Sequence, residues 1–147
     1  MNKILGFKDD YRFLSNFHIQ ELKDENGVLW PTSEHWYQAE KFVESELREK
    51  IRLCATPKES RYLGRRFTMR PDFDDIKLEV MRKILKVKFA NGTELANKLI
   101  ATGEAYLEET NWWKDSFWGV CKGVGQNNLG KLLMERRKEL LDETLGC

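Results

Sequence analysis

A chain of 147 residues is long enough to bury a hydrophobic core without support from a metal or disulfide bonds. Lysine and arginine number 25 against 24 aspartate and glutamate residues, which leaves a formal net charge of +1. This balance excludes a protein that holds nucleic acid mainly by bulk positive charge, although it is compatible with a local basic pocket for one phosphate.

The cysteines and the N-terminal segment indicate a cytoplasmic protein. Cys54, Cys121 and Cys147 are odd in number and have no CxxC spacing, and the sequence starts without an apolar signal segment. No apolar run approaches the length of a membrane span, so no membrane partner is expected. His18 and His35 are the only histidines and there is no HExxH motif, so the sequence predicts neither a metal site nor a cofactor.

Short apolar runs and turn residues predict extended structure from residue 1 to Trp30. Asn26-Gly27 separates the runs 17–22 and 28–30, which is the pattern of a β-hairpin. From Pro31 onward the pattern predicts helices, the first of them capped by Thr32 or Ser33. The predicted helical ranges are 32–46, 47–55, 57–63, 74–90, 94–101 and 127–142.

Two glycine-containing features complete the expected fold. Gly64 is expected to stop the third helix. The stretch 105–125 is rich in aromatic residues and glycine, and it is interpreted as a loop or short strands. The sequence therefore predicts an α+β fold, a mostly helical single domain over residues 1–147 with a small antiparallel sheet.

The first predicted helix carries an unusual polar stripe. At 100° per residue, Glu34, Gln38 and Lys41 fall on nearly the same side of the helix, with Tyr37 and Phe42 on either side of them. One interpretation is an ordinary amphipathic helix with its polar face in water. The other is a ligand cleft, because a plain solvent face is seldom bordered by aromatic rings on both sides.

Two cations stand where apolar residues are expected. Lys88 shares a helical stripe with Met81, Ile84 and Leu85, and Arg136 lies among several leucines of the last helix. Both side chains could extend along apolar surface with their charged ends in water. They could also form a buried ion pair or share an anion such as a phosphate.

Residues 125–131, Gly-Gln-Asn-Asn-Leu-Gly-Lys, match the first part of a P-loop. The next residue is Leu132, where a serine or threonine would hold magnesium, and no buried strand precedes the segment. A nucleoside triphosphatase is therefore not expected. What remains is either a simply capped helix start or a glycine-rich turn whose N–H groups face an anion.

Taken together, the segments resemble the NADAR (YbiA-like) family over most of the chain, from Gly6 to about Glu139. No single segment is specific, but the ordered set is. The segments that carry the resemblance are Phe13-Leu14-Ser15-Asn16-Phe17, Trp30-Pro31-Thr32-Ser33-Glu34-His35-Trp36-Tyr37-Gln38-Ala39-Glu40-Lys41, Leu63-Gly64-Arg65, Met81 with Lys88-Phe89, Leu99-Ile100-Ala101-Thr102-Gly103, Leu107-Glu108, Asp115-Ser116-Phe117-Trp118-Gly119 and residues 125–136.

This resemblance implies an α+β fold and an N-glycosidase, a hydrolase of ribose C1–N bonds. The resemblance implies one of two substrates. The first is a small ribosyl phosphate, namely a phosphoribosylamino-pyrimidine intermediate of riboflavin synthesis. The second is ADP-ribose on guanine bases of DNA. The sequence departs from the family pattern at Trp112 and Trp113, which bears on substrate choice. The implied functional positions are Glu34, Lys41, Asp115 and Trp118, surrounded by Asn16, Gly64, Arg65, Lys88 and Arg136.

Cleavage of a ribose C1–N bond passes through an oxocarbenium-like state, which requires negative charge beside C1 and a proton for the leaving nitrogen. Glu34 is the expected residue beside the sugar, and Asp115 the second carboxylate, with Glu108 as its substitute. Lys41 could tune Glu34, bind phosphate or attack an opened sugar as an amine. Trp118 is expected to stack on the base.

The remaining positions are assigned to substrate binding. Gln38 and Asn16 are expected to bind the substrate, and Arg65 and Lys88 to hold its phosphate. Arg136 is expected either to bind the phosphate or to orient a carboxylate.

Two other classes of protein use the same residues. A non-catalytic ADP-ribose or nucleotide-binding module would use the aromatic rings and cations without turnover. A structural protein would use the buried charges as ion pairs. The sequence does not specify an oligomeric state.

Overall fold

The computed structural model describes residues 2–146, and this chain forms two compact units. One is continuous, from Asn16 to Lys88, and is called the inserted unit because it interrupts the other unit in sequence. The second, the flanking unit, contains the residues up to Ser15 and those from Phe89 onward. The single domain expected from the sequence stays a prediction.

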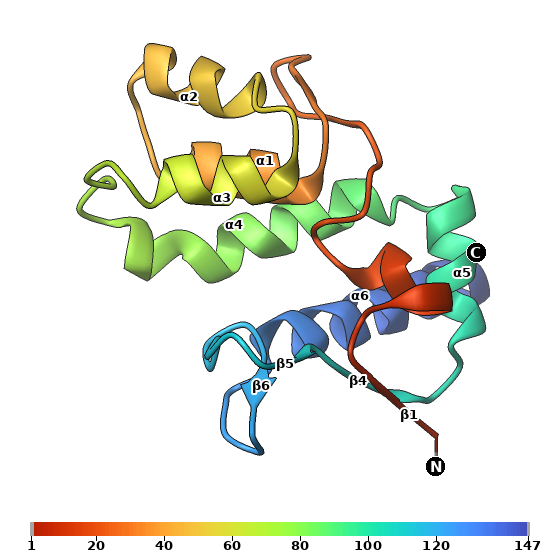
Figure 1. Ribbon diagram of the computed structural model, residues 1–147. Helices are drawn as coiled ribbons and strands as arrows, with labels where there is room; N and C mark the ends of the chain where they lie inside the picture. Colours follow the sequence, from red (N-terminus) through yellow and green to blue (C-terminus); the bar gives the residue numbers. More distant parts are fainter. Residues whose placement is uncertain (1, 147) are drawn as a thin grey trace. The chain divides into compact units, whose positions relative to one another are not determined.

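The inserted unit consists of a hairpin and four helices. In Figure 1, the helices run in colour from orange through yellow to green. Helix α1 packs against each of the other three helices, and α4 also contacts the hairpin. The elements are β2 (Leu22–Lys23), β3 (Leu29–Trp30), α1 (Ser33–Glu40), α2 (Ser45–Arg52), α3 (Pro57–Gly64) and α4 (Phe73–Lys88).

The hairpin predicted around Asn26-Gly27 is confirmed, with Leu22 opposite Trp30. Its turn is held by the buried carboxylate of Asp24, which accepts hydrogen bonds from Asn26 N (2.8 Å), Val28 N (3.0 Å) and Trp30 Nε1 (2.9 Å). Burial opposes ionisation of this carboxyl group, but the three donors outweigh it and lower the pKa of Asp24. Gly27 supplies the left-handed backbone of the turn, with φ +81°.

Helix α1 begins where the sequence predicts but ends early. Thr32 is the N-cap, and its hydroxyl accepts from His35 N at 3.1 Å. The helix was expected to reach residue 46, and this is wrong, because it ends at Glu40. Arg48 of α2 donates to the carbonyl oxygens of Ala39 (2.9 Å) and Phe42 (3.2 Å), so a side chain takes up carbonyl groups at the helix end.

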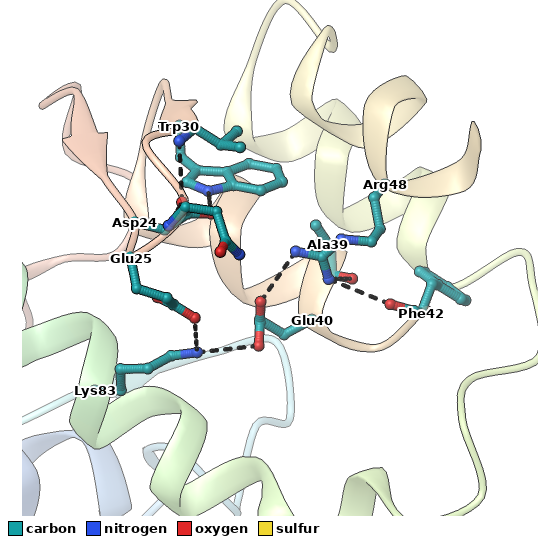
Figure 2. A network of polar contacts seen from close by, with 10 residues as sticks. Asp24, Glu25, Trp30, Ala39, Glu40, Phe42, Arg48 and Lys83 are labelled. Atoms are coloured by element: carbon teal, nitrogen blue, oxygen red, sulfur yellow. Dashed lines mark hydrogen bonds and ion pairs between the residues drawn. The ribbon is translucent and has the colours of Figure 1, made fainter. Parts of the chain in front are cut away.

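Figure 2 shows how these interactions connect the hairpin, α1 and α4. Lys83 of α4 bridges Glu25 of the hairpin (3.4 Å) and Glu40 of α1 (3.3 Å). Arg48 forms a second ion pair with Glu40 (3.1 Å) and lies over the Trp30 ring. The network fixes the end of α1 from two sides.

The flanking unit combines two strand pairs with two helices and a 3-10 helix. The last helix, α6, packs against α5 and β4. The elements are β1 (Lys3–Leu5), the 3-10 helix η1 (Asp9–Leu14), α5 (Glu94–Ala101), β4 (Tyr106–Glu108), β5 (Thr110–Asn111), β6 (Val120–Cys121) and α6 (Asn128–Leu145).

Both strand pairs of the flanking unit are parallel. Strand β1 pairs with β4, placing Ile4 beside Leu107, and β5 pairs with β6. The α+β, mostly helical class is confirmed, and the antiparallel pairing is the β2–β3 hairpin. Extended structure throughout the first thirty residues is wrong, because η1 interrupts it.

Within residues 2–146, no helix is both long and apolar enough to cross a membrane.

Candidate functional site

Glu34, the second residue of α1, is a carboxylate that is only 3% exposed. Gln38, one turn later, donates from Nε2 to Glu34 Oε2 at 2.6 Å. Arg61 of α3 reaches the same carboxylate, with Nη2 3.3 Å from Oε1 and Nε 3.4 Å from Oε2. A buried carboxylate with these two donors is held in one orientation, which a group acting on a substrate requires.

Asn16 fixes the start of α1. Its carbonyl oxygen accepts from Glu34 N at 3.1 Å, and its side-chain oxygen accepts from Ser33 Oγ at 2.9 Å. Its amide nitrogen lies 3.7 Å from Met81 Sδ. Asn16, a predicted site residue, therefore contacts Ser33 and Glu34, and Glu34 carries the predicted catalytic carboxylate.

Lys41 follows α1, and its ammonium group lies 5.8 Å from the centre of the Tyr37 ring. Burial lowers the pKa of Lys41 below the ordinary lysine value, and the charge of Glu34 opposes this shift. Arg65, Arg61 and Lys77 lower the pKa of Lys41 further. Three further cations therefore act on Lys41, which itself feels the charge of Glu34, and such a concentration of positive charge favours an anionic ligand.

Arg61 was not predicted from the sequence. Besides its contact with Glu34, its guanidinium lies 4.4 Å from the centre of the Phe17 ring. Arg61 lies on α3 and Arg65, four residues later, is the C-cap of that helix, so the two residues lie on nearly the same side. That spacing was visible in the sequence and could have drawn attention to Arg61 beside Gly64-Arg65.

Lys88, the last residue of α4, is 3% exposed and lies on the same side as buried Met81, Ile84 and Leu85. The interpretation of a charged end in open water is therefore wrong for Lys88, because the whole side chain is buried.

Arg136 of α6 is also buried, at 5% exposure, and has its own set of acceptors. Its Nε donates to Phe89 O at 3.1 Å, while Nη1 lies 3.1 Å from Glu139 and 3.4 Å from Glu143. This guanidinium both satisfies a main-chain carbonyl and pairs with two carboxylates.

Asp115 and Trp118 lie together in the loop between β5 and β6. Asp115 Oδ1 accepts from the main-chain N–H of Phe117 (3.2 Å) and of Trp118 (2.9 Å). Asn111 anchors the same loop, accepting from Asp115 N at 3.0 Å and donating to Asp115 O at 2.8 Å. Before Asp115, Trp112 is 83% exposed and meets Trp113 edge to face.

Glu108 at the end of β4 does not join that group within the described residues. It accepts from Tyr106 Oη at 3.0 Å and from the Thr110 hydroxyl. Burial, followed by the hydrogen bond to Glu108, raises the pKa of Tyr106. The side-chain contacts of Glu108 are therefore with Tyr106 and Thr110, while its main chain pairs with β1.

Residues 125–131, called the near-P-loop because they match only the first part of a P-loop, do not present their N–H groups to an anion. The N–H groups of residues 126, 127, 128 and 129 donate to the carbonyl oxygens of residues 116, 119, 117 and 118, in that order. The loop that carries Trp118 thus caps α6 with its own main chain. The interpretation of an anion-binding turn is wrong, because these donors are already used.

Gly130, the second glycine of that pattern, serves packing. A side-chain carbon at Gly130 would lie 2.1 Å from Leu107 O, so the glycine lets α6 approach β4 closely.

His35 is structural. Its ring nitrogens lie 2.7 Å from Thr32 Oγ1 and 3.0 Å from Cys54 O, and burial lowers the pKa of His35. Within residues 2–146, no cluster of three or more histidine, cysteine or acidic residues is arranged to hold a metal ion.

The structure therefore brings predicted site residues together within each unit. In the inserted unit these are Glu34, Gln38 and Lys41. Asn16 accepts a hydrogen bond from Glu34 N, and the charge of Arg65 lowers the pKa of Lys41. In the flanking unit they are Asp115 and Trp118.

Comparison with known proteins places this chain among enzymes. The N-glycosidase YbiA of Escherichia coli is 41% identical over 138 residues, covering 92% of this chain and 85% of that protein. A riboflavin biosynthesis protein of Vibrio vulnificus is 41% identical over 135 residues, covering 90% of this chain but 36% of that longer protein. The NMR structure of Escherichia coli YbiA matches with a TM-score of 0.86 and 39% identity, covering 99% of this chain and 89% of that one.

The expected class of enzyme, an N-glycosidase, is confirmed by these relatives. The family model for the NADAR domain matches residues 6–141, which is most of the sequence. The chain belongs to the NADAR family.

Proposed function

We propose that this N-glycosidase hydrolyses the ribose C1–N bond of a phosphate-bearing, nucleotide-like substrate. The observation that carries the proposal is the setting of Glu34, a buried carboxylate held by Gln38 and Arg61 with Lys41 and Arg65 acting nearby. One carboxylate can stabilise a developing cation at C1, and the surrounding positive charge favours the phosphate of the same substrate.

In the proposed reaction, Glu34 stands beside C1 and either stabilises the oxocarbenium-like state or activates water. Its place in the first turn of α1 favours negative charge at that position. Lys41 and Arg65 contribute positive charge for the phosphate, and Lys88 remains a further candidate for it. Lys41 is also a candidate amine nucleophile, because burial favours its neutral form at a lower pH than in an ordinary lysine.

Asp115 and Trp118 are proposed to keep the roles that the family resemblance implies, the second carboxylate and the base-stacking ring. Glu108 is the alternative to Asp115. We assign Arg136 to the support of the flanking unit, because its donors already meet Phe89 O and two glutamates.

We propose two alternative substrates for the same reaction, hydrolysis of a ribose C1–N bond. The first is a phosphoribosylamino-pyrimidine intermediate of riboflavin synthesis, which fits the name of the Vibrio vulnificus relative. The second is ADP-ribose on guanine bases of DNA. Both join a ribose C1 to nitrogen and both carry phosphate. We place either reaction in the cytoplasm.

The test is incubation of the protein with each substrate, following released base and released sugar phosphate. Glu34→Gln is the informative variant, and Glu46→Gln is its matched control, an exposed carboxylate in the first turn of α2. Hydrolysis of one substrate that disappears only in Glu34→Gln supports the proposal. Equal turnover by both variants contradicts the role of Glu34.

A non-catalytic nucleotide-binding module is the alternative function. It predicts that ribose phosphates raise the melting temperature of the protein while no base is released from either substrate. Thermal unfolding of the same samples therefore separates binding from hydrolysis.

A further inference from the structure

The amide of Gln38 is buried in one orientation. Its Nε2 donates to Glu34 Oε2 at 2.6 Å, while its Oε1 is fully enclosed and has no hydrogen-bond partner among the described residues. Turning the amide over would put Oε1 against the carboxylate, where two acceptors would repel each other. The nitrogen therefore faces Glu34 and the oxygen faces the other way.

Gly64, the last residue of α3, lies on the oxygen side of this amide. A side-chain carbon at Gly64 would lie 2.2 Å from Gln38 Oε1, 3.0 Å from Cδ and 3.2 Å from Cβ. The φ angle of Gly64 is outside the left-handed region, so the backbone would accept alanine. Gly64 was expected to stop the helix, yet the feature that requires glycine here is the room taken by Gln38.

The donors on Glu34 are unequal. Gln38 and the Nε of Arg61 both meet Oε2, and the Arg61 contacts, at 3.3 and 3.4 Å, are longer than the 2.6 Å contact of Gln38. Among the described residues, Arg61 Nη2 is the donor that meets Oε1. Oε1 is thus the less restrained oxygen, and Gln38 supplies the tightest constraint on the other.

We propose that Gln38 is a positioning residue that holds Oε2 of Glu34 so that Oε1 faces the reacting centre, and that Gly64 provides the space this amide needs. The inference rests on the proposed function, in which Glu34 stands beside C1. Gln38 acts through Glu34 and does not touch the substrate, because its own oxygen is enclosed.

The first test is Gly64→Ala, assayed on whichever ribosyl substrate the wild-type protein hydrolyses. The added carbon displaces the amide at the end of a flexible side chain, so the protein should fold while kcat falls about tenfold to a hundredfold, as expected for a misplaced catalytic group. KM should change little, because no substrate contact is removed. Lys58→Ala, an exposed change on the same helix, should match the wild type.

A double variant separates positioning from simple damage. Gln38→Ala should lower kcat by a similar factor, and adding Gly64→Ala to it should lower kcat no further, because the displaced amide is already gone. Independent, multiplicative losses would overturn the proposal. So would a Gly64→Ala protein with wild-type kcat and a wild-type melting temperature.

A second measurement needs no substrate. Gln20, Gln38 and Gln126 are the three glutamines of the sequence, so ¹⁵N-glutamine labelling resolves their side-chain amides by NMR, and the signal lost in Gln38→Ala is that of Gln38. The Gln38 signal should move in Gly64→Ala and in Glu34→Ala but not in Lys58→Ala. An unmoved signal in Gly64→Ala overturns the proposed contact. A moved signal in a protein that hydrolyses neither substrate contradicts the proposed function instead.

Discussion

Two groups of buried polar side chains, one in each unit of this molecule, have partners of different kinds. In the inserted unit, the buried carboxylate of Glu34 meets the side chains of Gln38 and Arg61. In the flanking unit, buried Asn127 donates to Leu107 O at 2.9 Å and accepts from Glu109 N at 3.0 Å, and Arg136 donates to Phe89 O. The group around Glu34 joins side chains to each other, whereas Asn127 and the Nε of Arg136 join side chains to the main chain.

This difference indicates where chemistry can take place. Main-chain partners are fixed by the fold, so a side chain bound to them mainly stabilises a turn or a helix end. Side-chain partners can exchange with a substrate, because breaking such a contact does not unfold an element. The contrast favours the group around Glu34 for catalysis. Variants in both units test this inference, and the expected effects decrease in size from Glu34 to Trp112.

The largest effect is expected at Glu34. Glu34→Gln should lower turnover about a hundredfold or more, because the charge beside C1 is lost. The melting temperature should stay close to the wild type, since an amide of the same shape can still contact Arg61. Single-turnover kinetics on the purified variant measure the effect. A folded variant that retains wild-type turnover would remove Glu34 from the mechanism.

Asp115→Asn provides the comparison in the flanking unit. The amide oxygen can still accept from the N–H groups of Phe117 and Trp118, so the loop should stay folded. If Asp115 also acts as the second carboxylate, turnover should fall about tenfold to a thousandfold as a positioned proton donor is lost. Unchanged turnover would leave Asp115 as a loop residue and turn attention to Glu108.

Lys41 gives an effect of intermediate size that depends on pH. Its lowered pKa means that the side chain loses its charge at a lower pH than an ordinary lysine does. If the ammonium binds phosphate, KM should rise as the pH increases through that pKa, and Lys41→Arg should shift this rise to higher pH because the guanidinium stays charged.

If Lys41 instead attacks the sugar as a neutral amine, the opposite pH dependence follows. Then kcat should increase through the same pKa, and Lys41→Arg should abolish turnover. Reduction with borohydride during turnover would trap a covalent adduct on Lys41 in this case. Absence of the adduct together with an active arginine variant would contradict the nucleophile.

Arg136→Met should lower stability by about 1–3 kcal/mol, because Phe89 O loses its buried donor. Chemical denaturation measures this loss, and it should be the same with or without ligand. Activity per folded molecule should not change. Poor binding by a stably folded variant, confined to phosphorylated substrates, would instead restore the phosphate role that the sequence left open.

The smallest effect is expected for Trp112→Ser. The side chain is 83% exposed, so the free energy of unfolding should change by no more than about 0.5 kcal/mol. Turnover on the two candidate substrates should be compared directly, because Trp112 lies where the sequence departs from the family pattern. A large loss of stability would show that the indole is packed in solution.

Local patterns in the sequence predicted much of this molecule. The hairpin at Asn26-Gly27 and the helix cap at Thr32 or Ser33 depend on neighbouring residues, and both are found, the cap at Thr32. The long helix expected from 74 to 90 runs from Phe73 to Lys88, and the last begins within one residue of the expected start. Such features follow from turn residues, caps and periodicity.

Features that depend on distant contacts were not predictable. The early end of α1 depends on Arg48 reaching back from α2, and the contact of Arg61 with Glu34 joins two separate helices. The N–H groups of the near-P-loop are occupied by a loop that no local pattern places there. Gly64 shows the same limit. A glycine is required there by the side chain of Gln38, which lies 26 residues earlier in the sequence.

The pairing of β1 with β4 sets an order of events during synthesis. Lys3 cannot pair until Tyr106 has been synthesised, and the whole of the inserted unit is synthesised between these two residues. At about 5–20 residues per second, that delay is roughly 5–20 s, far longer than a helix or hairpin needs to form. The first strand is therefore made early and paired late, and a tag or nascent-chain factor that occupies it would delay completion of the flanking unit.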